Sequence, residues 1–271
     1  MRAKDKMNYM KRILLIGIIA GLCSAVLFAE NAASFNASTY KNLLLQVDQA
    51  LAVLDTDVSA EYLIQKRDPG GATSTTKSTV FRRDAKNQFL VLILEPVIDK
   101  GKGYLKIGDN LWLYDPVGKT FTFTSAKERF QNSSFRNSDF EPSHLARDYE
   151  PLSAERVKLG TYDCTLLELQ AVTKDAAYPK MKIWVSDDTL VRKREEYSLS
   201  GAIMRTIAIP SYQKIGNRWL PASMVIIDHL QSKKIGDKVE YERTTVTISK
   251  PSLKALPDTV YTKEYLERVA R

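Results

Sequence analysis

The chain has 271 residues, of which 44% are hydrophobic and 27% are charged, and its formal net charge is +8. This length allows one large domain or two small ones, and the composition is that of a folded globular protein. With 2 His and 2 Cys in the whole sequence, a three-His or cysteine-rich zinc site is excluded. The Lys and Arg residues form no cluster of the kind that indicates a nucleic-acid partner.

Residues 1–29 have the pattern of a secretory signal peptide. The basic stretch MRAKDKMNYMKR precedes 17 uncharged residues at 13–29, as in exported proteins. Cleavage after Ala29 would leave 30–271 as a single exported domain. Because 1–29 carry five Lys or Arg and one Asp, their removal lowers the net charge from +8 to +4. That charge is ordinary for solubility and suits weak attraction to anionic lipid surfaces.

Two other fates of this segment stay open. Seventeen apolar residues are the lower limit for a membrane span, so an uncleaved signal would tether the protein to the membrane. Cys23 is a candidate for lipid attachment, although Leu22 stands where a lipoprotein signal has a small residue. The other cysteine, Cys164, lies in a strand-like run and is interpreted as a buried small hydrophobe.

The mature chain begins with one helical pattern and continues almost entirely as strands. Apolar residues recur at helical spacing over 39–54, which predicts a helix capped by Ser38 or Thr39. A short C-terminal helix is predicted in TKEYLERVAR. Between the two helices, strand patterns separated by turn residues cover 58–67, 73–83, 87–96, 104–123, 155–172, 178–186, 190–199, 203–213, 217–231 and 238–249.

These elements predict a mainly β (α+β) fold. Short turns mean antiparallel pairing, and a sheet of about 11 strands must curl or split. The runs 89–94 and 224–230, and less strongly 111–114, are apolar on both faces, whereas a sheet with one solvated face alternates. Their second face therefore needs a cover, for which the long N-terminal helix or a lipid-binding hollow is a candidate.

Residues 125–153 interrupt the strand pattern. Phe130, Phe135 and Phe140 are spaced five apart among polar residues, which matches neither the helical nor the strand period. Two interpretations stay open for these three residues. They form a lip or plug at an apolar opening, or they pin a surface segment to the core.

Motifs for catalysis or cofactor binding are absent from the sequence. It contains no phosphate-binding loop, no dinucleotide fingerprint and no nucleophile elbow. Asp187-Asp188 is interpreted as a turn, His229 as a satisfied strand residue, and His144 as a possible base for which the spacing indicates no partner. We therefore expect no catalytic residue, no metal and no cofactor, and we treat an envelope hydrolase as a hypothesis that no motif supports.

The segments KGKGYLKIGDNLWLYDPVGKTFTF, NSDF and SHLARDYEP resemble the LolA-like outer membrane lipoprotein-sorting family, which includes the LolB and RseB branches. The order of the motifs, spread over about 40–270, carries the resemblance. His144 departs from it, since the family has an acidic residue there. The matching residues are Lys102, Gly103, Tyr104, Leu105, Leu111, Trp112, Tyr114, Pro116, Asn137, Ser138, Asp139, Phe140, Leu145 and Tyr149.

The resemblance implies an incomplete (half) barrel around an apolar cavity, with helices as a lid. It also implies a non-enzymatic periplasmic carrier of lipid or acylated lipoprotein, served by an inner-membrane transporter and an outer-membrane acceptor. A protein-binding sensor module like RseB is the alternative. Apolar strand residues and large aromatics dominate ligand cavities, and strand parity decides which face each occupies. The candidate lipid-binding residues are Leu44, Val47, Phe89, Val91, Ile93, Trp112, Tyr114, Trp184 and Ile226.

Overall fold

The computed structural model describes residues 35–270. The predicted signal peptide at 1–29 and its Cys23 lie outside these residues. Across 35–270, no helix is both long enough and apolar enough to cross a membrane.

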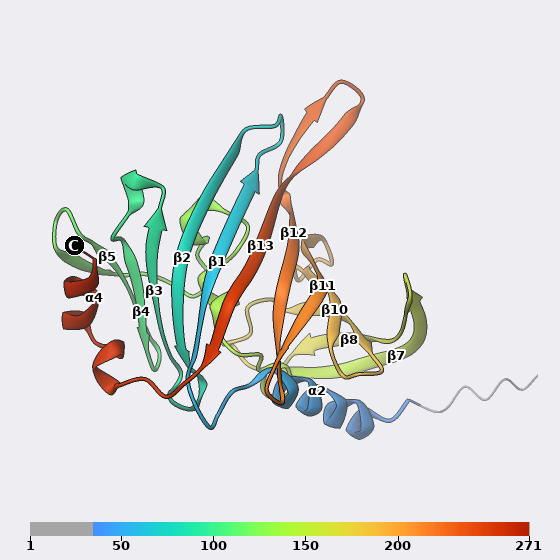
Figure 1. Cartoon of the computed structure of the whole chain (residues 1–271). Coiled ribbons are helices and arrows are strands. Elements are labelled where there is room, and N and C mark those ends of the chain that lie inside the picture. The colour runs from blue at the N-terminus through green and yellow to red at the C-terminus, as the bar shows by residue number, and fades with distance from the viewer. Residues whose placement is uncertain (1–34, 271) are drawn as a thin grey trace, which may run out of the picture. The chain divides into compact units, whose positions relative to one another are not determined.

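A single antiparallel sheet makes up most of the described chain (Figure 1). It has 13 strands in the order β6-β5-β4-β3-β2-β1-β13-β12-β11-β10-β9-β8-β7 and is not closed into a barrel. The mainly β prediction is confirmed, and tight turns divide the runs 104–123 and 155–172 to give the 13 strands. The strands are β1 (Val58–Arg67), β2 (Thr73–Arg83), β3 (Gln88–Glu95), β4 (Gly103–Ile107), β5 (Asn110–Asp115), β6 (Thr120–Phe123), β7 (Tyr149–Leu159), β8 (Tyr162–Ala171), β9 (Lys180–Ser186), β10 (Val191–Tyr197), β11 (Ile203–Ile215), β12 (Arg218–Ile235) and β13 (Lys238–Leu253).

The helices of the described chain are few and short. Three are α-helical: α2 (Ala37–Leu51), α3 (Leu145–Asp148) and α4 (Lys263–Val269). Single 3-10 turns occur at η1 (Asp84–Lys86), η2 (Val97–Asp99), η3 (Phe130–Asn132), η4 (Asn137–Phe140) and η5 (Asp258–Tyr261).

Helix α2 is confirmed, with different ends from those predicted. Its cap is Asn36, whose side chain accepts hydrogen bonds from the backbone N–H groups of Ser38 and Thr39. The helix ends at Leu51, three residues early. The reason is that Val53 leaves the helix for the core, where its N–H donates to the buried carboxylate of Asp84 at 2.9 Å.

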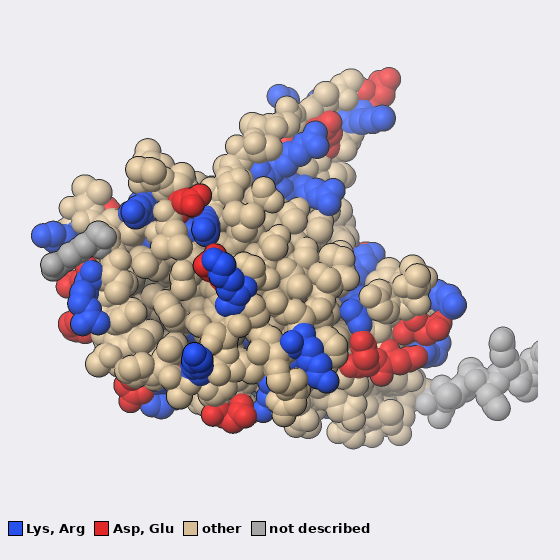
Figure 2. Space-filling view, in the orientation of Figure 1, with Lys and Arg blue, Asp and Glu red and all other residues tan. Residues whose placement is uncertain are grey.

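Strand register divides the sheet into two faces. The inner face carries the alternate residues that include Val91, Ile207 and Ile226, and these belong to the largest hydrophobic cluster. The outer face carries Leu90 and Leu105, which pack against α4. The outer face is seen in Figure 2, where Lys and Arg side chains gather along the projecting β12–β13 hairpin.

Strand β3, which is apolar on both faces, is covered on its outer side by the C-terminal helix α4, not by the N-terminal helix. Leu266 of α4 is fully buried against Leu90 and Leu105. Gly103 permits this approach, because a Cβ atom there would lie 2.5 Å from the Leu266 side chain. Helix α2 instead packs at the other end of the sheet, against β7 and neighbouring strands.

The strand order determines where the chain must run between β6 and β7. These strands are the two edges of the sheet, because the first and last strands, β1 and β13, pair in its middle. Laid flat, 13 strands at about 4.8 Å spacing would be roughly 58 Å wide. Residues 124–148, here called the crossover, could span about 85 Å if fully extended. The crossover therefore has length to spare for η3, η4 and α3, and it lies behind the sheet in Figure 1. Residues 149–153, expected to be irregular, belong to β7.

We expect Leu266→Ala to lower the free energy of unfolding by about 3 kcal/mol, because it leaves a cavity between α4 and the outer face. Urea denaturation measures the change. Glu267→Ala, at an exposed position on the same helix, is the control and should change stability by less than about 0.5 kcal/mol. Equal effects of the two substitutions would contradict the packing role of α4.

Candidate functional site

The crossover buries its three phenylalanines against the inner face. Phe130, Phe135 and Phe140 are each 0% exposed. Phe140 lies at the centre, with ring centroids 4.9 Å from both Phe130 and Phe135. The sheet supplies Tyr62 and Phe89, which lie 5.5 and 5.7 Å from Phe140. The three rings thus join the main core and occupy part of the hollow of the sheet.

A row of buried charges crosses four neighbouring strands of the inner face. In the strand register, Glu196 of β10 lies opposite Arg205 of β11. Arg205 lies opposite Asp228 of β12, and Asp228 lies opposite Glu242 of β13. All four side chains are buried. Isolated buried charges are costly unless they are paired and hydrogen-bonded, so this row needs partners from outside the sheet.

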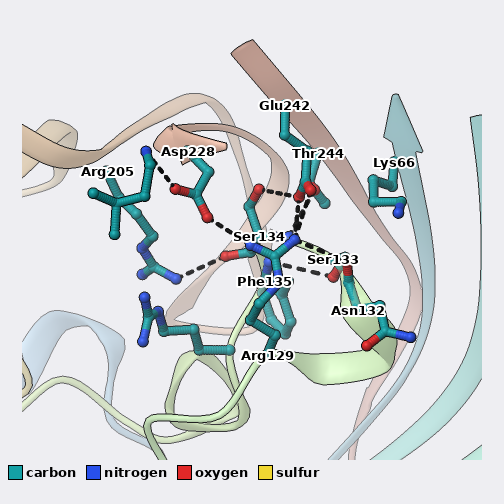
Figure 3. A network of polar contacts seen from close by, with 12 residues as sticks. Lys66, Arg129, Asn132, Ser133, Ser134, Phe135, Arg205, Asp228, Glu242 and Thr244 are labelled. Atoms are coloured by element: carbon teal, nitrogen blue, oxygen red, sulfur yellow. Dashed lines mark hydrogen bonds and ion pairs between the residues drawn. The ribbon is translucent and has the colours of Figure 1, made fainter. Parts of the chain in front are cut away.

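The crossover supplies partners for this row (Figure 3). Arg129 donates to Asp228 and to Glu242 at 2.6 Å each. Ser134 is held on three sides: its hydroxyl donates to Glu242, its N–H to Thr244, and its carbonyl accepts from Arg205. These contacts fix the position of the crossover along the sheet.

Asp139 of the NSDF motif completes the network on the other side of Arg205. Its carboxylate accepts hydrogen bonds from Arg205 at 3.0 and 3.1 Å and from Arg194 at 2.7 Å. Burial by itself would raise the pKa of Asp139. The guanidinium groups of Arg205 and Arg194 outweigh burial and hold this pKa below its ordinary value of 3.8.

A cavity of about 270 Å³ lies between the crossover and the inner face. One wall is apolar and comes from β1, β11, β12 and β13; it includes Tyr62, Ile207, Met224, Ile226 and Ile248. The other wall is polar and comes from η4, α3, β10 and the loop before β9. The site therefore has the form of a ligand pocket, apolar on one side with a few polar groups opposite.

Helix α2 holds the part of the crossover that borders this cavity. Asp48 accepts hydrogen bonds from the backbone N–H groups of Leu145 and Ala146 at 3.0 and 2.8 Å, and so caps α3. Lys41 donates to the Tyr149 carbonyl at 2.8 Å. His144 lines the cavity, where burial and the Arg147 cation lower its pKa.

The predicted lipid-binding residues fall into four groups. Ile226 lines the cavity. Phe89, Val91 and Ile93 lie on the inner face beneath the crossover phenylalanines, while Leu44 and Val47 pack α2 onto β8 and β9. Trp112, Tyr114 and Trp184 do not share this face.

These three aromatic residues lie on the outer face of the sheet. Tyr114 and Trp112 pack under α4, and Lys263 lies 4.4 Å above the Trp112 ring. Trp184 is paired with Lys193, whose ammonium lies 4.3 Å from its ring. We predicted that these three residues face the cavity, but the alternation of side chains along their strands places them on the opposite face.

Several other sequence expectations are met. Asp187-Asp188 forms a turn between β9 and β10, and Cys164 is buried in β8. His229 lies in β12, with its Nε2 at 2.9 Å from the Thr206 hydroxyl.

Sequence reasoning missed the polar half of the site. Arg194, Arg205, Glu196 and Tyr178 line the cavity, and none was a candidate. A usable signal was present: Arg205, Asp228 and Glu242 occupy inward positions in strands that are otherwise apolar at those positions. Charged residues at core positions of neighbouring strands predict a buried ion-pair network.

We expect Asp139→Asn to lower the free energy of unfolding by about 3 kcal/mol, because removing one partner of a buried pair leaves charge uncompensated. Asp187→Asn is the control, since Asp187 pairs with Arg156 at the exposed surface. Such pairs contribute about 0–1 kcal/mol. Urea denaturation at pH 7 measures both variants, and equal losses would argue against a buried network.

Comparison of wild type with Asp139→Asn also gives a prediction for the pH dependence of stability. Because the pKa of Asp139 is lowered in the folded state, its stabilising effect is full above its unfolded pKa and disappears as pH falls through the folded pKa. The stability difference between wild type and Asp139→Asn should therefore shrink below about pH 4. Denaturation midpoints at pH 7, 4 and 3 measure it; a difference independent of pH would contradict the ionised state of Asp139.

The chain resembles proteins of known structure along most of its length. It shares 23% identity and a TM-score of 0.68 with a LolA superfamily protein from Nitrosomonas europaea, covering 86% of this chain and 100% of the other. An outer membrane lipoprotein-sorting protein domain from Vibrio parahaemolyticus shares 19% identity and a TM-score of 0.73, covering 86% of this chain and 100% of the other. A DUF1329 family protein from Desulfovibrio piger shares 19% identity and a TM-score of 0.72, covering 85% of this chain and 98% of the other.

Sequence comparison gives a second, independent match. A model of a protein family described as "-like: Uncharacterized protein" matches residues 85–268, whereas no curated protein matches the chain. The matched residues run from η1 to α4 and include the crossover and the strands that line the cavity. Because this model matches more than half of the chain, the chain belongs to that family, and it shares its fold with a LolA superfamily protein and with an outer membrane lipoprotein-sorting protein domain.

Proposed function

We propose that this protein is a non-enzymatic periplasmic carrier that binds an acyl chain of a lipid or lipoprotein. The single observation that carries the proposal is the cavity of about 270 Å³ on the inner face, with its apolar wall of Ile207, Met224 and Ile226. It lies between the crossover and the inner face of a sheet that is not closed into a barrel.

The size of the cavity supports one chain at a time. Ligand pockets usually measure about 300–1,000 Å³, so this cavity, at about 270 Å³, is slightly smaller than that range. Each buried methylene group contributes about 0.8 kcal/mol, and a chain along the apolar wall would gain most of its affinity in this way. Several chains together would need the crossover phenylalanines to move.

The crossover is suited to controlling access to the cavity. Besides its buried phenylalanines, charged and polar contacts hold it to the sheet, such as Arg129 with Asp228 and Asp139 with Arg205. Directional contacts of this kind can be exchanged without unfolding the sheet, and a mobile cover lets a carrier both bind and release. The proposal includes a role for Phe130, Phe135 and Phe140 as a lid at the entry to the cavity.

The cellular setting follows from the N-terminal pattern and is proposed with the function. Residues 1–29 would direct export, 30–271 would form one domain in the periplasm, and the donor and acceptor would be an inner-membrane transporter and an outer-membrane protein. A protein-binding sensor is the competing function. Co-purification of one stoichiometric protein, without lipid exchange, would favour the sensor.

We expect Met224→Trp, which enlarges a side chain on the apolar wall, to weaken binding of a fluorescent fatty acid at least about 10-fold, since overpacking removes space for the chain. Trp184→Leu, on the outer face, is the control and should leave binding unchanged. Native mass spectrometry of gently purified wild type should detect bound lipid. Absence of both lipid and probe binding in wild type would overturn the carrier function.

A further inference from the structure

Two buried polar groups that line the cavity have no partner among the described residues: the Tyr178 hydroxyl and one oxygen of Glu141, whose other oxygen pairs with Lys106. Tyr178, in the loop before β9, lines the cavity and is 4% exposed. Its backbone carbonyl accepts a hydrogen bond from the Tyr149 hydroxyl at 3.0 Å. The Tyr178 hydroxyl itself is buried and has no hydrogen-bond partner among the described residues. Buried hydroxyls are nearly always paired, and this one lines a cavity in which a bound molecule could supply the partner.

The surroundings of Tyr178 make its hydroxyl a hydrogen-bond donor. Burial raises its pKa, so the phenol stays protonated at neutral pH. The guanidinium groups of Arg136 and Arg205 lie 5.4 and 5.6 Å from its ring centroid, and nearby cations strengthen a phenol as a donor. The missing partner is therefore an acceptor, such as a carbonyl oxygen.

The charge of the cavity wall argues against an anionic ligand. Five cationic and five anionic side chains line the cavity in the described chain: Arg82, Lys127, Arg147, Arg194 and Arg205, against Asp139, Glu141, Asp148, Asp175 and Glu196. The two cations nearest to the sheet, Arg194 and Arg205, are already paired with Asp139 and Glu196. Lys127 forms no ion pair within residues 35–270, but it is exposed, so a free carboxylate would find no unpaired cation beside the buried Tyr178 hydroxyl.

We propose that the cavity selects an uncharged acyl ester or amide, whose carbonyl oxygen accepts a hydrogen bond from the Tyr178 hydroxyl while the acyl chain lies along the apolar wall. This deepens the proposed carrier function and rests on it. An ester carbonyl is what a glycerolipid presents and an amide carbonyl is what an N-acylated protein presents, so the chemistry is shared by both sources. Tyr178 acts here by holding the acyl carbonyl, while the balanced charge of the cavity wall disfavours a free fatty acid.

The test compares two Tyr→Phe substitutions that each delete one buried, unpaired hydroxyl. Tyr178→Phe removes the hydroxyl in the cavity. Tyr261→Phe is the matched control, because the Tyr261 hydroxyl is also buried and unpaired but Tyr261 lies in η5, near Arg83, and does not line the cavity. Thermal unfolding of both variants should match wild type, since neither loses a hydrogen bond.

Four probes then separate the contributions of head group and chain. They are monoolein (an ester), an N-oleoyl amide, oleate and the hydrocarbon diphenylhexatriene, each titrated at pH 7.5. Wild type should bind the ester or the amide more tightly than oleate. Tyr178→Phe should weaken the ester and amide about 5- to 10-fold, the effect of one hydrogen bond, and should leave diphenylhexatriene unchanged. Tyr261→Phe should change none of the four.

The outcomes distinguish the inference from the function beneath it. If wild type prefers the amide to the ester, an N-acylated protein is indicated as the source of the ligand. If it prefers the ester to the amide, a glycerolipid is indicated. Binding of oleate as tightly as the ester, or equal affinities of wild type and Tyr178→Phe for ester and amide, would overturn the inference and leave the carrier standing. Failure of wild type to bind any of the four probes would overturn both.

Discussion

The structure depends on one pairing, that of the first strand with the last. β1 and β13 pair from Val58 with Leu253 to Arg67 with Arg243, and this places β6 and β7 at opposite edges of the sheet. The chain between them has no route except across a face of the sheet. A crossover on the inner face can bury apolar side chains that would otherwise meet water, so the same segment connects the two halves and completes the core. The cavity is the space that this crossover leaves unfilled.

Two kinds of contact hold the crossover, and each does a different job. The phenylalanines supply buried area, which is favourable but non-directional. The charged row of Glu196, Arg205, Asp228 and Glu242 supplies direction, because each group accepts or donates at defined positions. Buried ion pairs contribute little net stability when their desolvation is counted, and breaking one is costly. The network therefore determines where the crossover sits more than how stable the fold is.

The site could be predicted only in part, and the division follows from the geometry of strands. Alternation along a strand tells which residues share a face, so Phe89, Val91 and Ile93 were correctly grouped. It does not tell which face is the inner one, and Trp112, Tyr114 and Trp184 lie on the outer face. Large aromatic residues are common in ligand pockets, but here they pack under α4 or beside lysines. The apolar runs required two covers, and the sequence could not say that α4 would provide one of them.

The sequence by itself determined the class of fold, the antiparallel pairing, the first and last helices, and the place where the strand pattern breaks at the crossover. These are local properties, set by periodicity and turn residues a few positions apart. Only the tertiary structure decided that the three phenylalanines are fully buried, that charges from four strands form one row, and that Tyr178 reaches the cavity with an unpaired hydroxyl. Those facts depend on residues up to about a hundred positions apart meeting across the sheet, and register over such distances is fixed by packing and not by local sequence.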